Sequence, residues 1–227
     1  MGRRGDDAEM TSDLERWLAA SFPKARWKTP GDALGVLTHR VRLRDRGGKP
    51  PQDHLFVDLE TLGFVGRPLF LVGLLYATGP KTGELVQLVA RDYAEEEGTL
   101  RFFAEEYAAF PAWVTFNGKS FDVPSLRLRY AFHRLSAPLP EEHVDLLHIA
   151  RRHFRGVLPD CKLRTLERRV CGRHRVDDLD GSRVPDAYHR YVRDGDPTWL
   201  EPILRHNIED LITLVELYRV LFEMEES

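Results

Sequence analysis

The sequence of 227 residues predicts an α/β fold, in which a mixed five-stranded sheet is covered by helices and followed by a helical C-terminal part. Three strand-like runs follow one another with short turns between them, which predicts an antiparallel meander. Helical and strand-like segments then alternate, as they do in β-α-β units. Beyond Leu147 only helical patterns occur. This order of elements is typical of a sheet with helices on its faces.

The core of the fold is expected in residues 51–227, where each element has its own pattern. The meander strands are apolar runs, the later strands are shorter, and the last helix is long and amphipathic. In chain order we expect strands over 54–61, 68–77 and 84–90, a helix over 99–110, a strand over 111–116, a helix over 123–135, a strand over 143–147 and the final helix over 197–224.

The first fifty residues are interpreted as an appendage that precedes this domain. Residues 12–20 have the pattern of a short amphipathic helix. From His39 to Arg46, arginines alternate with Val41 and Leu43, as they would along an amphipathic strand. Breaker segments that contain Gly and Pro separate these elements from each other and from the domain.

The composition indicates a soluble, cytoplasmic globular protein. The chain is 42% hydrophobic and 30% charged, which is ordinary for that class. No apolar run approaches the roughly 20 residues of a membrane span, and the N-terminus is charged where an export signal would be apolar. Cys161 and Cys171 are the only cysteines. We expect them to be reduced and structural, because together with His174 they match no standard zinc spacing.

The distribution of charge leaves two interpretations open. A net charge of -3 argues against a protein that coats nucleic acid. However, the segment from Arg151 to Arg175 carries nine Lys or Arg residues against two acids. It is either solvated surface or a track for phosphates. On the second interpretation, Arg151, Arg152 and Arg155 contact a nucleic-acid backbone.

The run HLFVDLET, from His54 to Thr61, places two carboxylates in an otherwise buried strand. Side chains two residues apart point to the same face of a strand, so Asp58 and Glu60 stand side by side. Like charges at that distance disfavour each other unless a positive group lies between them. A divalent metal ion would be such a group.

Two further segments hold acids that would complete a metal site. Asp122 follows a strand at the start of a helix, where α/β folds gather functional groups. On the final helix, His206 and Asp210 are four residues apart and share a face. Taken alone, Asp122 reads as a helix N-cap, and His206 with Asp210 reads as a solvated pair.

Taken together, the acids Asp58, Glu60, Asp122 and Asp210 form a set of hard oxygen ligands, which suits Mg²⁺ or Mn²⁺. Two such ions about 4 Å apart bracket a scissile phosphate in phosphodiester hydrolysis. The sequence therefore predicts a site for two divalent ions.

Three motifs carry a specific resemblance. DLET, NGKSFD and HNIED, in this order between residues 58 and 210, resemble the exonuclease motifs of the DEDD superfamily, which has the ribonuclease H-like fold. The segments HVDLLHIARR and GDPTWLEPILRHNIEDLITLVELY make the chain most similar to the bacterial YprB-type ribonuclease H-like domain. The resemblance covers residues 54–222. It implies two-metal hydrolysis of nucleic acid from a 3′ end.

The resemblance also implies roles for residues beside the acids. Thr61 and Leu62 follow the first motif where the family meets the terminal nucleotide. Asn117 and Phe121 match positions of the second motif that touch sugar or base. Asp145 matches a recurring acid of the fold, which we interpret as a structural residue or as one that supports the metal-binding acids.

His206 departs from the family pattern. One branch of the superfamily has Tyr four residues before the last Asp, and the other has His five residues before it. This chain has His at the tyrosine spacing. We expect His206 to orient or deprotonate the attacking water.

The resulting expectation is a 3′–5′ exonuclease that depends on Mg²⁺ or Mn²⁺, acts on single-stranded DNA and serves DNA repair. RNA as the substrate and internal cleavage by the same fold are alternatives. Another alternative is a non-catalytic nucleic-acid-binding module. Such a module usually lacks one of the metal-binding acids, and none is missing here.

Overall fold

Seven strands form one mixed sheet in the computed structural model, in the order β1-β2-β5-β4-β3-β6-β7. The structure describes residues 13–30, 34–44, 51–107, 109–136, 139–175 and 178–226. The strands are β1 (Ala25–Lys28), β2 (Gly35–Arg42), β3 (His54–Thr61), β4 (Leu69–Gly79), β5 (Thr82–Val89), β6 (Ala112–Thr115) and β7 (Glu142–Asp145).

The expected antiparallel meander is confirmed. β4 pairs antiparallel with both β3 and β5, and the turns between these strands are short. β6 then runs parallel to β3, and β7 runs parallel to β6. The mixed α/β fold predicted from the element order is therefore the fold of the chain.

The prediction of five strands is wrong, because residues 25–28 and 35–42 form two further strands. β2 pairs antiparallel with β5 along its whole length, from Gly35 opposite Val89 to Arg42 opposite Thr82. β1 pairs with β2 at the edge of the sheet. The alternating pattern from His39 indicates a strand, but the sequence alone does not say which strand it will join. The remaining parts of the first fifty residues, 1–12, 31–33 and 45–50, lie outside the described residues.

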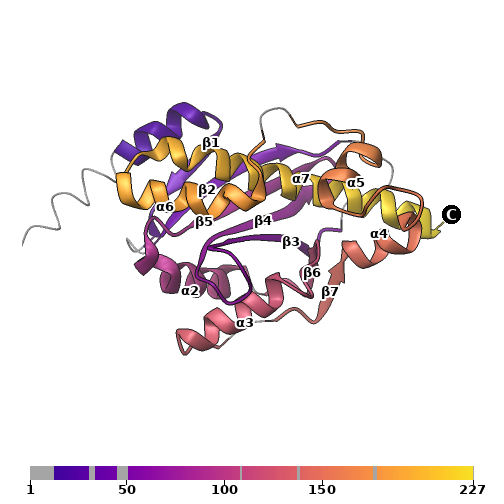
Figure 1. Cartoon of the computed structure of the whole chain (residues 1–227), viewed down its shortest axis with the longest axis horizontal. Helices are drawn as coiled ribbons and strands as arrows, with labels where there is room; N and C mark the ends of the chain where they lie inside the picture. The colour runs from indigo at the N-terminus through magenta and orange to yellow at the C-terminus, as the bar shows by residue number, and fades with distance from the viewer. Residues whose placement is uncertain are drawn as a thin grey trace, which may run out of the picture.

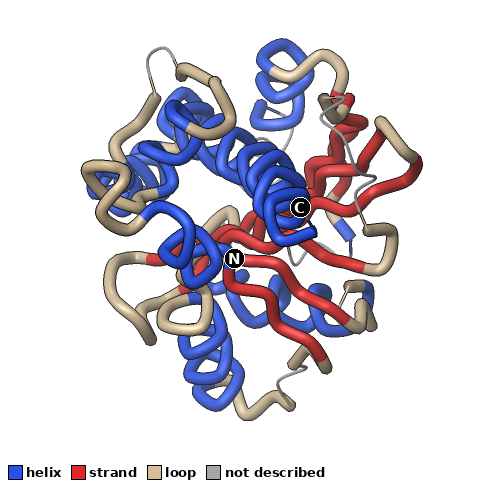
Figure 2. The backbone as a smooth tube through the Cα atoms, turned by 90° about the vertical axis from the view of Figure 1, so that its right-hand side faces the viewer, coloured by secondary structure: helices blue, strands red, loops and turns tan. Residues whose placement is uncertain are grey.

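Helices cover both faces of the sheet (Figures 1 and 2). Residues 13–21 are also helical. The other helices are α2 (Glu96–Glu106), α3 (Asp122–Phe132), α4 (Leu146–Phe154), α5 (Leu163–Arg169), α6 (Val184–Asp194) and α7 (Glu201–Glu226), with short 3-10 turns η2 (Tyr93–Glu95), η3 (Gly181–Arg183) and η4 (Pro197–Trp199). Every helix among the described residues is too short or too polar to cross a bilayer.

The two faces of the sheet have separate hydrophobic cores, because side chains alternate along each strand. On one face, Val57, Val72 and Val86 pack with residues of α2 and α3 such as Phe103 and Leu126. On the other face, Phe56, Leu75 and Leu85 pack against α4, α5 and α7. The second face is the one on which α7 crosses the strands (Figure 1).

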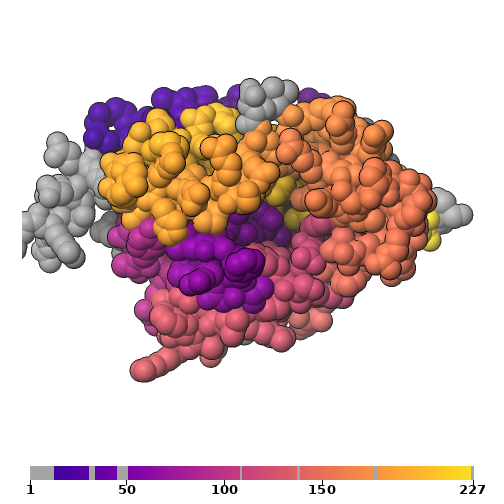
Figure 3. All heavy atoms as spheres, viewed as in Figure 1, coloured from indigo at the N-terminus to yellow at the C-terminus, as the bar shows by residue number. Residues whose placement is uncertain are grey.

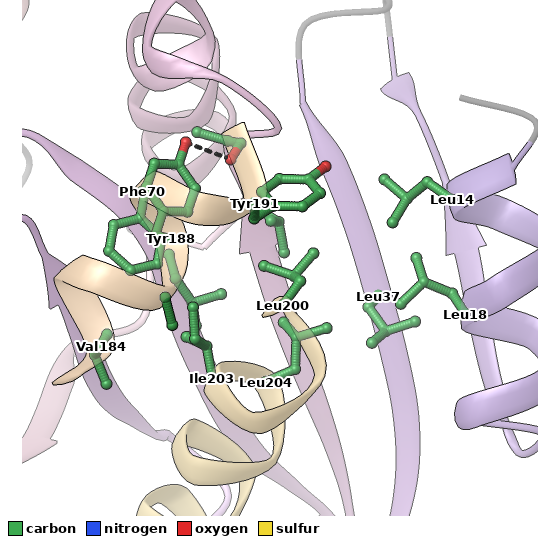
Figure 4. Close-up of a cluster of buried hydrophobic side chains, with 14 of the residues drawn as sticks. Leu14, Leu18, Leu37, Phe70, Val184, Tyr188, Tyr191, Leu200, Ile203 and Leu204 are labelled. Atoms are coloured by element: carbon green, nitrogen blue, oxygen red, sulfur yellow. Dashed lines mark hydrogen bonds between the residues drawn. The ribbon is translucent and has the colours of Figure 1, made fainter. Parts of the chain in front are cut away.

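A third cluster joins the N-terminal segment to the C-terminal helices (Figure 4). Leu14 and Leu18 of the helix over 13–21 and Leu37 of β2 belong to the same buried cluster as Tyr188 of α6. The Tyr188 ring stacks on Phe70 with 3.9 Å between centroids, and its hydroxyl donates to the carbonyl of Ala90 at 2.9 Å. Residues 13–42 are therefore part of the packing that holds α6 and α7 on the sheet.

A chain that begins at residue 51 tests the expected domain boundary. We expect the free energy of unfolding to fall by at least about 4 kcal/mol. The chain loses the buried side chains of Leu14, Leu18 and Leu37, and burial of each stabilises the fold by about 1.5–3 kcal/mol. It should also aggregate, since the edge of β5 becomes exposed. Thermal and urea unfolding measure the loss, and a chain that begins at residue 13 is the control. Equal stability of the two truncated chains would show that residues 13–50 are a dispensable appendage.

Candidate active site

Asp58 and Glu60 lie on the face of β3 that α7 covers. Phe56, two residues before Asp58, packs in the cluster that contains Leu211 of α7. Alternation along the strand then places Asp58 and Glu60 on the same face, and both are partly buried. The expected adjacency of these two carboxylates is confirmed.

A row of residues across three strands holds Asp58 in place. Asp58 is opposite Gly73 of β4, and Gly73 is opposite Gln87 of β5. The side chain of Asn207, from α7, lies over Gly73, where a Cβ atom would come within 2.2 Å of its Oδ1. Asn207 Nδ2 donates to Asp58 Oδ2 at 2.8 Å, and Gln87 Nε2 donates to Asn207 Oδ1 at 2.9 Å. Gly73 is thus the position that lets α7 come close enough to orient the Asp58 carboxylate.

Asp122 reaches the same carboxylates from α3. It is the first residue of that helix and is buried, while Phe121 occupies the N-cap position. The pairing of β3 with β6 ends at Phe56. On this edge, therefore, the later part of β3 faces the loop after β6, while its other edge remains paired with β4. Burial raises the pKa of Asp122 to about 7, although the backbone N–H groups of Asp122 and Leu59 stabilise its charge. Asp122 is therefore bound to β3 and does not act as an N-cap.

Asp145 shapes the loop that leads to Asp122. Its Oδ1 accepts from the backbone N–H of Asn117 at 2.8 Å, and its Oδ2 accepts from that of Lys119 at 3.0 Å. It also caps α4 by accepting from the N–H of Leu147. The interpretation of Asp145 as a structural residue is confirmed, since it fixes a turn in which Asn117 has a φ of 64°.

Asp210 and His206 lie on α7 one turn apart, and both have charged partners. Arg175 donates to Asp210 Oδ1 at 2.5 Å, and His206 Nε2 is 3.5 Å from Asp210 Oδ2. On its other side, His206 Nδ1 is 2.9 Å from Asp178 Oδ1. An ionised carboxylate can only accept, so Nδ1 carries the hydrogen of this bond. Asp178 thereby fixes the orientation of the His206 ring.

The electrostatics show that the four acids converge. Burial raises the pKa of Asp58 well above its ordinary value, and the charges of Asp210, Glu60 and Asp122 raise it further. Burial also raises the pKa of Glu60 to about 8, against the opposing effect of His206. Asp210 and Asp122 again raise it. Four acids from β3, α3 and α7 therefore share one region of concentrated negative charge.

The positive groups in this region are protein side chains. Arg175 and His206 both approach Asp210, and Arg175 also bonds Glu167 at 2.8 Å. Among the residues that the structure describes, no three His, Cys, Asp or Glu side chains form a preformed metal site. Arg175 and His206 thus bring positive charge to these acids in addition to the divalent metal ion that the sequence predicts. The donor chemistry still fits a hard divalent cation, because the acids offer oxygen ligands without sulfur.

The remaining predicted site residues lie at several places. Thr61 is buried at the end of β3 and donates to the carbonyl of Gly63 at 2.7 Å, while Leu62 packs against the cluster of Figure 4. Phe121 is partly buried before α3. Asn117, Arg151 and Arg155 line a cavity beside α4. Arg152, by contrast, forms an ion pair with Glu225 of α7.

Sequence reasoning missed four residues of this site: Gln87, Arg175, Asp178 and Asn207. Asn207 carried a signal, since it is a polar residue in line with the apolar face of the last helix, and it is fully buried. The other three come from segments whose proximity depends on the tertiary structure. In the sequence, Arg175 was one cation of a basic run.

A family model for the RNase H superfamily matches residues 55–222. The chain belongs to the RNase H superfamily. Over 168 residues it is 32% identical to the uncharacterized protein YprB of Bacillus subtilis strain 168. The aligned region covers 72% of this chain and 40% of that protein. The chain thus spans less than half of this relative's length.

A solved structure supports the same fold. The family B DNA polymerase from the hyperthermophilic archaeon Pyrobaculum calidifontis superposes with a TM-score of 0.61 at 14% identity. The match covers 84% of this chain and 29% of the polymerase. The family model begins at residue 55, so β1 and β2 extend the sheet outside the family-matched region.

In this RNase H superfamily chain the surface is hollowed beside the elements that carry the acids. Figure 3 shows the hollow between the turn that follows β3, in purple, and the segment of α4 and α5, in orange. The colours of β3 and α7 are visible at its bottom. A substrate on this face would therefore meet the strand and the helix that carry the carboxylates.

A double-mutant cycle tests the close approach of α7 at Gly73. Gly73→Ala should destabilise the metal-free protein by roughly 1–3 kcal/mol, because the new methyl group overlaps the Asn207 side chain. In an Asn207→Ala background the same substitution should cost less than about 1 kcal/mol, because the overlap is gone. Urea unfolding gives all four free energies. Equal costs in the two backgrounds would show that Asn207 does not hold this position.

Proposed function

We propose that this protein is a divalent-metal-dependent nuclease of the DEDD type, and that it removes nucleotides from the 3′ end of single-stranded DNA. Membership of the RNase H superfamily supports a nuclease or another nucleic-acid-processing function. The observation that carries the proposal is the convergence of Asp58, Glu60, Asp122 and Asp210 from three separate elements onto one region. A purely structural role would not concentrate so many like charges, because each raises the free energy of the others.

The four acids would hold the metal ions, Mg²⁺ or Mn²⁺. Two such ions, when bound, lower the pKa of a water molecule and stabilise the leaving oxygen of a phosphodiester. Asn207 contributes by holding the Asp58 carboxylate at Oδ2. Arg175 contributes by neutralising part of the charge of Asp210.

His206 is the residue of this chain that can move a proton at the site. Burial alone would lower the pKa of His206, but the carboxylates of Asp210, Glu60 and Asp178 raise it above its ordinary value. With Nδ1 engaged by Asp178, the atom available for proton exchange is Nε2, which faces Asp210. A positioned acid–base group of this kind is worth about 10²–10⁴-fold in rate.

The substrate end would be bound by residues around the hollow. We assign Thr61 and Leu62 to the terminal nucleotide, since they follow the Asp58–Glu60 pair directly at the end of β3. Asn117 and Phe121 lie in the loop that Asp145 shapes, and they would contact sugar or base.

A cleavage assay tests the proposal directly. We expect the protein to shorten single-stranded DNA labelled at its 5′ end in single-nucleotide steps with Mg²⁺ or Mn²⁺. Excess EDTA should stop the reaction. Asp58→Asn should slow it by at least about a hundredfold, because loss of even an indirect metal partner costs about 10–100-fold. Denaturing gels resolve the ladder, and a labelled RNA oligonucleotide is run beside the DNA.

The control for Asp58→Asn is Glu105→Gln, which removes one exposed carboxylate from α2, away from the site. A rate that survives EDTA, or one that Asp58→Asn and Glu105→Gln reduce equally, contradicts the assignment of the acids. Fragments of mixed length without a 3′ ladder indicate internal cleavage, and shortening of RNA alone overturns the choice of DNA.

The pH dependence of turnover tests the role of His206. If His206 accepts the proton, turnover falls on the acid side with an apparent pKa above about 6.5, its ordinary value. Asp178→Asn removes a negative charge that raises this pKa. The acid limb should therefore move to lower pH in this variant. His206→Ala should slow turnover by at least about tenfold and abolish the limb.

Asp186→Asn, which removes an exposed charge from α6, is the matched control and should leave the limb in place. An acid limb that stays unchanged in both Asp178→Asn and His206→Ala would assign the titration to another group. Metal titration of His206→Ala by calorimetry should remain close to that of the parent protein.

A further inference from the structure

A cavity of about 650 Å³ opens between the end of β6, α4 and α5. Its volume lies within the range of about 300–1,000 Å³ that small-molecule sites have. The lining residues are Phe116, Asn117, Leu147, Arg151, Arg155, Gly156, Leu158, Pro159, Asp160, Cys161, Lys162 and Leu163. The cavity thus combines cations with apolar side chains.

The cations of the cavity differ from Arg152 and Arg173 of the same basic segment. Arg151, Arg155 and Lys162 are exposed, and within the described part of the chain no carboxylate forms an ion pair with them. Arg152 and Arg173, by contrast, pair with Glu225 and Glu209. The basic run therefore divides into structural cations and cations that remain available to an anionic ligand.

The acid in the cavity lining is already bound to the chain. Asp160 Oδ1 accepts from the backbone N–H of Lys162 at 3.0 Å. A hydrogen bond from Thr165 and this backbone bond lower the pKa of Asp160. It thus serves the loop that carries Lys162, and the cavity keeps a surplus of positive charge.

The apolar part of the cavity gives a surface on which a flat ring can lie. Phe116, Leu158 and Leu163 are partly buried and pack against the cluster beneath α4 and α5, and Leu147 is buried beside them in the cavity wall. Bases of single strands bind proteins by stacking on such aromatic and apolar surfaces while cations follow the phosphates. The two chemistries of the cavity match the two parts of a nucleotide.

One loop of the chain joins the cavity to the candidate active site. Asn117 lines the cavity, and Asp145 holds its backbone N–H. Five residues later the same loop ends at Asp122, which belongs to the acid cluster. A nucleic-acid strand that reaches the acids could therefore follow this loop past Asn117 into the cavity.

We propose that this cavity binds a nucleotide of a single nucleic-acid strand on the 5′ side of the bond that is cleaved. Its phosphates lie against Arg151, Arg155 and Lys162, and its base lies against the apolar wall. The inference rests on the proposed nuclease function for the direction of the strand. The binding itself is independent of cleavage.

Binding to metal-free protein tests the inference. A fluorescein-labelled 12-nucleotide single-stranded DNA is titrated in EDTA and followed by anisotropy. Arg151→Gln should raise Kd at least about threefold, whereas Arg152→Gln should leave it within about 1.5-fold. The pair is matched, since both are neighbouring exposed arginines on α4 and each substitution removes one charge. Thermal unfolding of both variants should match the parent, because neither side chain is buried.

Two further measurements define what the cavity binds. The triple variant Arg151→Gln, Arg155→Gln, Lys162→Gln loses three phosphate contacts. Each contact contributes about 0.7 to the slope of log Kd against log salt on single strands, so this slope should fall by about 2. A series of oligonucleotides with one abasic position should show one internal position where binding weakens by about fivefold or more, because a base loses its stacking surface.

Equal effects of Arg151→Gln and Arg152→Gln would overturn the inference in favour of general surface attraction. An unchanged salt slope in the triple variant, no measurable binding by the parent, or no sensitive abasic position would also overturn it. Because all of these measurements are made in EDTA, they stand whether or not the protein cleaves DNA. Cleavage that fails while the binding differences persist would reject the nuclease proposal alone.

Discussion

The contact between Asn207 of α7 and Gly73 of β4 is the constraint on which the site depends. Only glycine permits the Asn207 side chain to rest on the sheet at this point. From there Asn207 joins Gln87 of β5 to Asp58 of β3 through hydrogen bonds of 2.9 and 2.8 Å. The register of α7 on the sheet is thereby determined, and it places His206 and Asp210 beside the carboxylates of β3.

The site also shows how a fold tolerates several acids in a partly buried place. Burial raises the pKa values of Asp58, Glu60 and Asp122, and the charges of the neighbouring acids raise those of Asp58 and Glu60 further. Arg175 and His206 offset part of this charge at Asp210. The compensation is incomplete, because the pKa of Glu60 is still raised to about 8. Sites that hold such charge cost stability, as expected where groups are arranged for chemistry rather than for folding.

The surroundings of the site extend in two directions. On one side of the sheet, β2 covers the edge of β5, and Leu14, Leu18 and Leu37 help to pack α6 and α7. Beyond β3 and β6, the loop held by Asp145 leads from the acids to the cavity at α4 and α5. The first arrangement stabilises the helix that carries Asp210. The second joins the acids to the cavity along one stretch of the chain.

The sequence by itself determined the meander, the shared face of Asp58 and Glu60, and the position of Asp122 at the first turn of α3. These features follow from local periodicity, which one segment contains completely. Only the tertiary structure decided that residues 25–42 join the sheet, and that Asn207 and Arg175 bond the acids while Arg152 turns to Glu225. Such contacts join residues far apart in the chain. Which distant segments meet depends on the packing of the whole molecule, because no local pattern contains both partners of the contact.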